Sequence, residues 1–261
     1  MGEGTITTEL RTSSNGDKVA WIFVDRQNRL NCMSTAQNQR LVAAIEAAGG
    51  DPEVRAVVLT GAGDKSFIGG ADLNELRGLD RAGARAYITG LHRVCHAVRD
   101  CAVPVIGRVN GYCLGGGLQV AAACDMRVAS DNAVIGMPEV HMGLPSVIEA
   151  ALLPGLIGWG KTREMLLVGK TYDAAEALEM RFVERVVAPA ELDTAVAEWV
   201  DGICAAGPLA IKSQKKLMTV WEDSSLRGGI AAGIDAIADA YLTGEPQERI
   251  EAFFAAKKTK G

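Results

Sequence analysis

The chain has 261 residues, 48% of them hydrophobic and 23% charged, and its 27 Lys and Arg against 32 Asp and Glu give a net charge of −5. A chain of this length and apolar content can bury a sizeable core without disulfide bonds or metals, which excludes an intrinsically disordered protein. The acidic balance lacks the basic footprint of a nucleic-acid or anionic-membrane binder, and no apolar run reaches the roughly 18 residues of a spanning helix, so we expect neither partner.

Cysteine and histidine usage indicates a reducing compartment and no metal centre. The six cysteines contain no C-x-x-C pair, and no H-E-x-x-H motif accompanies the three histidines. The N-terminal stretch is polar and contains Glu3 and Glu9, unlike a signal peptide. We therefore expect free thiols, a cytoplasmic location and no metal site.

The first half of the chain alternates between strand and helix patterns. Short apolar runs rich in β-branched residues predict strands at residues 19–24, 54–60 and 103–109. Amphipathic spacing predicts helices at residues 36–48 and 81–97. The first of these helices has Ser34 as a candidate N-cap and Gly49-Gly50 as a stop. Residues 121–135 fit either further strands or a buried helix with a return strand.

Beyond about residue 145 only helical patterns follow. Ser146 and Glu149 have the spacing of a capping box and predict a helix start. Later helices are expected from Thr171 onward and at residues 191–205, 208–221, 226–242 and 247–258. Strands alternating with helices, and then helices alone, indicate an α/β core over residues 1–200 followed by a helical C-terminal region over residues 201–261.

Glycine is the unusual part of the composition, at 30 of 261 residues, or about 11% against a usual 7% or so. Two clusters each follow a predicted strand and precede a helical pattern: S-F-I-G-G-A-D-L at 66–73 and N-G-Y-C-L-G-G-G-L-Q at 110–119. This geometry frees backbone N–H groups, and two of them could converge on one carbonyl oxygen. Taken alone, each cluster is more often a tight turn or a site of close helix packing.

Taken in order, the two clusters and three further motifs resemble the crotonase superfamily (enoyl-CoA hydratase/isomerase) from about Val19 to the C-terminus. The motifs are D-R-x-x-R-L-N at 25–31, F-x-x-G-A-D at 67–72, N-G-x-x-x-G-G-G at 110–117, A-x-x-C-D at 121–125 and P-E-x-x-x-G at 138–143. The resemblance implies a spiral of ββα units with a helical C-terminal trimerisation region, assembled as a trimer or a dimer of trimers.

The same resemblance implies an acyl-CoA thioester as substrate and no cofactor, because CoA enters as part of the thioester. The family holds the thioester oxygen with two backbone N–H groups, which by motif position are those of Ala71 and Gly116. Preorganised donors of this kind stabilise the enolate as its charge develops on oxygen.

The carboxylates decide the reaction. Family hydratases carry one Glu two positions after the triple glycine, where this chain has Gln119, and a second in P-E, where it has Glu139. Because an amide cannot exchange protons near neutral pH, Glu139 is the expected acid/base. One carboxylate suits double-bond isomerisation better than two-base hydration, whereas the family resemblance favours the hydratase, and both remain open.

Glu149 adds a further alternative. It is either the cap of its helix or a replacement second carboxylate, which would suit a hydrolase or decarboxylase. The loss of the first Glu also leaves open a non-catalytic acyl-CoA-binding relative.

The remaining candidate residues concern substrate binding. Arg29 and Lys65 are expected near the CoA phosphates or adenine, although solvated surface positions explain them equally well. Phe253 and Lys257 resemble the family segment that reaches the CoA of a neighbouring subunit. The other expected contacts, along the glycine loops and the acyl pocket, are Gly69, Gly70, Asp72, Tyr112, Gly115 and Met142. For Asp72 a structural cap, and for Tyr112 and Met142 core packing, are the simpler interpretations.

Overall fold

The computed structural model describes residues 4–258, so the outermost residues of both expected regions lie outside it. Two sheets form the core. The larger has six strands in the order β1-β2-β3-β5-β7-β10, and the smaller has four in the order β4-β6-β8-β9. Their bounds are β1 Thr5–Thr12, β2 Lys18–Asp25, β3 Val54–Gly61, β4 Ser66–Ile68, β5 Val105–Val109, β6 Tyr112–Leu114, β7 Met126–Ser130, β8 Val134–Gly136, β9 Thr171–Asp173 and β10 Arg185–Val187.

The chain forms a spiral whose successive turns pass through both sheets. Three successive turns each place one strand in the large sheet and the next in the small sheet before a helical segment: β3-β4, then β5-β6, then β7-β8. Strands of successive turns pair in parallel, β3 with β5 and β5 with β7, and likewise β4 with β6 and β6 with β8. Equivalent points of three turns therefore lie side by side, which is the expected ββα arrangement.

Helices cover the sheets and continue beyond them. The α-helices are α1 Thr35–Gly50, α2 Leu73–Leu76, α3 Arg81–Asp100, α4 Gly116–Ala123, α5 Leu153–Val168, α6 Ala174–Glu179, α7 Leu192–Ala205, α8 Pro208–Asp223, α9 Leu226–Ala240 and α10 Glu245–Lys258. The short 3₁₀ helices are η1 Gln27–Arg29, η2 Pro138–Met142, η3 Ile148–Leu152 and η4 Pro189–Glu191. For residues 121–135 the helix-and-return-strand alternative is correct, since α4 is followed by β7 and β8.

The β3 strand shows why the core has two parts. Its side chains alternate, as strand geometry requires, so Val57 and Leu59 enter the main cluster that α1, α3 and α4 cover. Ala56 and Val58 point to the other face and join a second cluster built on α7. A strand buried on both faces reads as a continuous apolar run, and for this reason the sequence predicted it well.

Local signals place α1 correctly except at its end. Ser34 accepts from the Gln37 N–H and forms a capping box with that residue, as an N-cap serine should. The helix ends at Gly49-Gly50, but both glycines are still helical and Asp51 is the C-cap. The six cysteines are free thiols, as expected.

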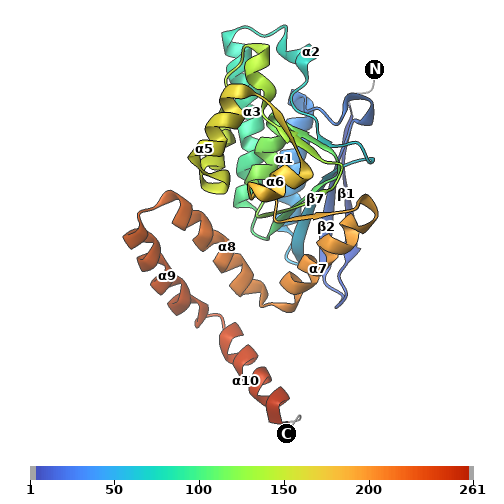
Figure 1. Cartoon of the computed structure of the whole chain (residues 1–261). Coiled ribbons are helices and arrows are strands. Elements are labelled where there is room, and N and C mark those ends of the chain that lie inside the picture. The colour runs from blue at the N-terminus through green and yellow to red at the C-terminus, as the bar shows by residue number, and fades with distance from the viewer. Residues whose placement is uncertain (1–3, 259–261) are drawn as a thin grey trace.

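The C-terminal helices depart from the core after α7, which ends at Ala205 (Figure 1). Helix α7 still packs on the large sheet through Val200 and Ile203. Helix α8 is attached by Lys215, which is 5% exposed and donates to the Val98 and Val103 carbonyls and to Asp125 Oδ2 at 2.7 Å. Helix α9 doubles back along α8, and α10 extends away from the body (Figure 1).

Helices α9 and α10 expose several apolar side chains. On α9 these are Ile230, Ile234 and Ile237, and on α10 they are Ile250, Phe253 and Phe254. Within residues 4–258 no single helix is long and apolar enough to cross a membrane; the bent pair Pro189–Ala205 and Pro208–Asp223, at 109°, passes on length and composition alone.

Candidate active site

Three segments meet where parallel strands of the small sheet end. Gly69 and Ala71 follow β4, Gly115 and Gly116 follow β6, and Glu139 follows β8. Because β6 lies between β4 and β8, the second glycine loop lies between the first loop and the carboxylate. The residues lining the pocket there, of about 600 Å³, are Arg29, Cys32, Gly69, Gly70, Ala71, Asp72, Leu73, Asn74, Leu76, Leu114, Gly115, Gly116, Pro138, Glu139, His141, Met142 and Leu144.

A short parallel bridge orients the Ala71 N–H. Met33 pairs with Ala71: the Met33 N–H donates to the Gly70 carbonyl, and the Asp72 N–H donates to the Met33 carbonyl, both at 2.8 Å. In such a bridge the neighbours of Ala71 face Met33, so the N–H of Ala71 itself points to the opposite side. Since Ala71 lines the pocket, this N–H is available to a ligand there.

Helix α4 supplies the second N–H. Gly116 is its first residue, and first-turn N–H groups have no partner within a helix. The helix start is pressed against β4, because a Cβ on Gly117 would lie only 2.0 Å from the Ile68 carbonyl oxygen. Only a glycine permits this approach, which brings the two loops together.

Glu139 is the carboxylate of the pocket. It is held in η2 and half-buried, and its Oε2 accepts a hydrogen bond from Ser146 Oγ at 3.2 Å. Its Oε1 lies 2.7 Å from where a Cβ of Gly115 would be, so the absence of a side chain there makes room for the carboxylate. Burial raises the pKa of Glu139 above the ordinary carboxyl value, and the Ser146 hydrogen bond partly opposes that rise.

Asp72 lines the same pocket but is held in place by other bonds. Its carboxylate caps α2 by accepting from the Asn74 N–H and pairs with Arg26 at 2.7 Å, with both side chains largely buried. Burial alone would raise the pKa of Asp72, but the hydrogen bonds from Arg26 and Asn74 outweigh it and lower that pKa. The structural interpretation of Asp72 as a cap is therefore confirmed.

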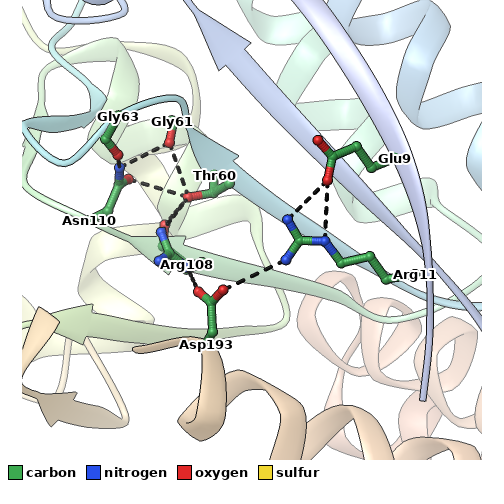
Figure 2. A network of polar contacts seen from close by, with 8 residues as sticks. All are labelled: Glu9, Arg11, Thr60, Gly61, Gly63, Arg108, Asn110 and Asp193. Carbon is green, nitrogen blue, oxygen red and sulfur yellow. Dashed lines mark hydrogen bonds and ion pairs between the residues drawn. The ribbon is translucent and has the colours of Figure 1, made fainter. Parts of the chain in front are cut away.

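A polar network fastens the second glycine motif to the loop after β3. Asn110 Nδ2 donates to the carbonyls of Gly61 and Gly63 at 2.9 and 2.6 Å. Figure 2 shows the continuation through Thr60 and Arg108 to Asp193 of α7, with Arg11 of β1 on its other side. The asparagine of the N-G-x-x-x-G-G-G motif thus fixes the start of the loop that carries Lys65.

The structure brings nine of the predicted residues to this pocket and leaves six outside its lining. Those that line it are Arg29, Gly69, Gly70, Ala71, Asp72, Gly115, Gly116, Glu139 and Met142. Lys65 lines a smaller hollow of about 260 Å³ beside Asn28 and Gly63. Tyr112 is exposed on β6, and Phe253 and Lys257 lie on α10, where the Lys257 ammonium is 4.7 Å from the Phe253 ring centre. Gln119 and Glu149 are buried and do not line the pocket, and one side-chain oxygen of each, Oε1 and Oε2 respectively, has no hydrogen-bond partner.

The capping-box prediction for Ser146 and Glu149 is wrong. The N-cap of η3 is Val147, which makes no side-chain cap bond, and Ser146 turns to Glu139 instead. Glu149 is 6% exposed, and its Oε1 lies 2.8 Å from Nδ1 of His92 on α3. Ile148, just before it, has a φ of +46°, which for a β-branched residue costs on the order of 1–3 kcal/mol.

Sequence reasoning missed the residues that support the site from neighbouring elements. Ser146 was interpreted as a cap, and nothing in the sequence singled out Tyr87 or Leu91 of α3. Tyr87 Oη donates to the Met33 carbonyl at 2.8 Å, and Leu91 packs beneath Gly116. Their four-residue spacing on one helix face was the available signal, but it is shared by any core helix.

The arrangement can stabilise a negative oxygen and move a proton beside it. Two backbone N–H groups reach the pocket from separate loops, and a carboxylate with a raised pKa stands next to one of them. Among residues 4–258, no group of three or more His, Cys, Asp or Glu side chains is placed to hold a metal ion.

Comparison with known proteins agrees with this geometry. The family model described as enoyl-CoA hydratase/isomerase matches residues 14–260. The chain is 31% identical over 245 residues to a short-chain-enoyl-CoA hydratase of Clostridium acetobutylicum, covering 94% of each chain. It is 30% identical over 243 residues to a crotonyl-CoA hydratase of Syntrophomonas wolfei, covering 93% of this chain and 94% of that protein.

Solved structures show the same fold. An enoyl-CoA hydratase from Bacillus anthracis superposes with a TM-score of 0.90 at 29% identity, covering 96% of both chains. The similarity thus spans the spiral core and the helical C-terminal region together, and with them all three segments of the pocket. The chain belongs to the enoyl-CoA hydratase/isomerase family and is an enzyme of that type.

Proposed function

We propose that the pocket binds an enoyl-CoA thioester, that the N–H groups of Ala71 and Gly116 hold the thioester oxygen, and that Glu139 transfers the proton. The observation that carries the proposal is the convergence of these three groups at the ends of β4, β6 and β8. An oxyanion donor of this kind contributes on the order of 3 kcal/mol to the transition state.

Glu139 has the properties of a proton carrier. Of the two carboxylates that line the pocket, Asp72 is committed to Arg26 and the start of α2, whereas Glu139 is hydrogen-bonded to the neutral hydroxyl of Ser146 and to backbone. Burial brings the pKa of Glu139 closer to neutral pH, and a group that both takes and returns a proton works best when its pKa lies near the working pH.

Within the family, a single proton carrier favours double-bond migration. Glu139 takes a proton from C2 of a 3-enoyl thioester, the charge of the resulting dienolate rests on the thioester oxygen, and the proton returns to C4, so that the double bond moves from C3–C4 to C2–C3. Gln119 lies outside the pocket lining and cannot exchange protons. The names of the hydratase relatives support hydration of a 2-enoyl thioester as the other outcome.

A panel of 2-enoyl- and 3-enoyl-CoA esters tests the proposal. Product mass detects hydration and double-bond position detects isomerisation, and we expect turnover of at least one class. Glu139→Gln should abolish proton exchange while the ester still binds. Binding of CoA esters without deuterium entering the acyl α- or γ-carbon, for every ester tried, would instead favour a non-catalytic acyl-CoA-binding role.

Glu149 supports a second candidate function. Its carboxylate does not line the pocket, but it is 6% exposed and its Oε2 has no hydrogen-bond partner beside the Oε1 contact to His92, which supports it as a second acid/base for hydration, hydrolysis or decarboxylation. Glu149→Gln keeps the side-chain shape and removes only the proton exchange. If Glu149→Gln hydrates a 2-enoyl-CoA at the wild-type rate, this second candidate fails.

The CoA end and the assembly belong to the same proposal. Arg29, which lines the pocket, and Lys65, which lines the smaller hollow, are the side chains that we expect to meet the CoA phosphates. The apolar face of α9 suits self-association into a trimer or a dimer of trimers, with Phe253 and Lys257 reaching a neighbouring site. Light scattering would give the mass of the assembly, and a charge on the α9 face, Ile234→Glu, should reduce it. We also propose a cytoplasmic location, which fractionation would test.

A further inference from the structure

We propose that helix α3 positions both N–H donors of the oxyanion site, through Tyr87 under the Ala71 half and Leu91 under the Gly116 half. The inference rests on the proposed function of those two N–H groups. The donors belong to loops 45 residues apart in the chain, so their relative position needs a common support. The side chains of Tyr87 and Leu91 lie one helical turn apart on the same face of α3.

Tyr87 is connected to the peptides around Ala71 by a continuous chain of hydrogen bonds. Tyr87 Oη donates to the Met33 carbonyl at 2.8 Å, and the same carbonyl accepts the Asp72 N–H at 2.8 Å. The Met33 N–H in turn donates to the Gly70 carbonyl. Tyr87 therefore holds the strand segment against which the peptides on either side of Ala71 are fixed.

Tyr87 is well suited to this task. It is only 4% exposed, and burial raises the pKa of its phenol, so the hydroxyl remains a donor throughout the working pH range. A buried hydroxyl that lost this partner would be left unpaired, which makes the contact costly to break and hence rigid.

Leu91 supports Gly116 by close van der Waals packing. Leu91 is fully buried, and its Cδ2 lies 2.8 Å from where a Cβ of Gly116 would be. The side chain therefore fills the space directly against the first residue of α4. Since α3 is a 20-residue helix packed on both α1 and α4, these two supports keep a fixed separation.

The test is the ultraviolet absorption of a bound chromophoric ester, 4-dimethylaminocinnamoyl-CoA, together with kcat and KM. Donors that polarise the conjugated thioester carbonyl shift its absorption to the red, so the shift reports their placement directly. Tyr87→Phe removes one oxygen and keeps the ring. Leu91→Val shortens the side chain that packs against Gly116 by one carbon and keeps the position apolar.

Tyr172→Phe is the matched control. Tyr172 is as deeply buried as Tyr87, and its hydroxyl donates to Glu164 of α5, outside the pocket. We expect Tyr87→Phe to lower kcat about five- to tenfold, as the loss of one buried hydrogen bond implies, with KM little changed. The red shift should shrink in Tyr87→Phe and in Leu91→Val, and stay at the wild-type value in Tyr172→Phe.

Two outcomes would overturn the inference: a wild-type red shift and kcat in both α3 variants, or an equal loss in Tyr172→Phe, which would indicate general loosening of the core. Spectra are compared at saturating ester on folded protein, verified by its melting curve, so that instability does not imitate the result. If the wild-type protein itself neither shifts the spectrum nor turns over any ester, the proposed function fails instead.

Discussion

Gly117→Ala tests whether close packing of α4 on β4 sets the oxyanion site. The added Cβ would lie 2.0 Å from the Ile68 carbonyl oxygen, where real Cβ atoms stay beyond 3.0 Å. Because the obstacle is backbone, the start of α4 must move away from β4 by about 1 Å or more. A misplacement of about 1 Å can cost on the order of a hundredfold in rate, so we expect kcat to fall about a hundredfold. Overpacking should also lower the free energy of unfolding by about 1–3 kcal/mol.

Two other glycines supply a graded comparison. In Gly116→Ala the new Cβ meets the end of the Leu91 side chain at 2.8 Å rather than backbone at 2.0 Å, so its effect should be smaller than that of Gly117→Ala. In Gly202→Ala, inside α7, nothing lies within 4 Å of the Cβ. That variant should keep kcat and gain up to about 1 kcal/mol of stability from helix propensity. Steady-state kinetics and thermal melts measure all three, and a Gly117→Ala enzyme with the kcat of wild type would refute the reasoning.

Three further predictions concern the proton carrier and the attachment of the C-terminal helices. Glu139→Gln should lower kcat by about 10²–10⁴ with binding retained, measured by turnover and by titration with an inert CoA ester; turnover near that of wild type would contradict it. The base form of Glu139 is needed, so wild-type activity should fall as the pH drops through a pKa that lies above the ordinary carboxyl value; Ser146→Ala removes a hydrogen bond that lowers this pKa and should move the acid limb of the pH–rate profile to higher pH. An unmoved limb would show that another group controls the profile. Lys215→Met leaves the buried Asp125 carboxylate without its ammonium partner and should cost about 3–5 kcal/mol of unfolding free energy in denaturant titrations; a loss below about 1 kcal/mol would count against this account of how α8 is held.

The sequence predicted the elements that carry their own local signal. The β3 run is apolar on both faces, and Ser34 has a capping partner at the right spacing, so both appear in the structure as expected. The glycine loops could also be located, since each follows a strand. The three-residue strands β4, β6 and β8, at whose ends the site is built, are too short for any periodicity to reveal.

The misinterpretation of Ser146 and Glu149 has a tertiary cause. Their spacing satisfies a capping box, yet each side chain finds a partner outside its own helix: Ser146 bonds to Glu139, seven residues before it, and Glu149 to His92 of α3, 57 residues before it. A local pattern cannot compete with a buried carboxylate whose desolvation must be compensated. The contribution of Tyr87 was hidden for the same reason, because its hydroxyl acts on a carbonyl 54 residues away.

The contacts of Lys215 have a consequence for the order in which parts of the chain fold. Its ammonium reaches the end of α3, the segment before β5 and the turn before β7, at residues that all lie at least 90 positions before Lys215 in the chain. Helix α8 therefore gains these three contacts only after α3, β5 and β7 have come together. In the order of folding, the docking of the C-terminal helices follows the packing of the core segments that supply the acceptors of Lys215.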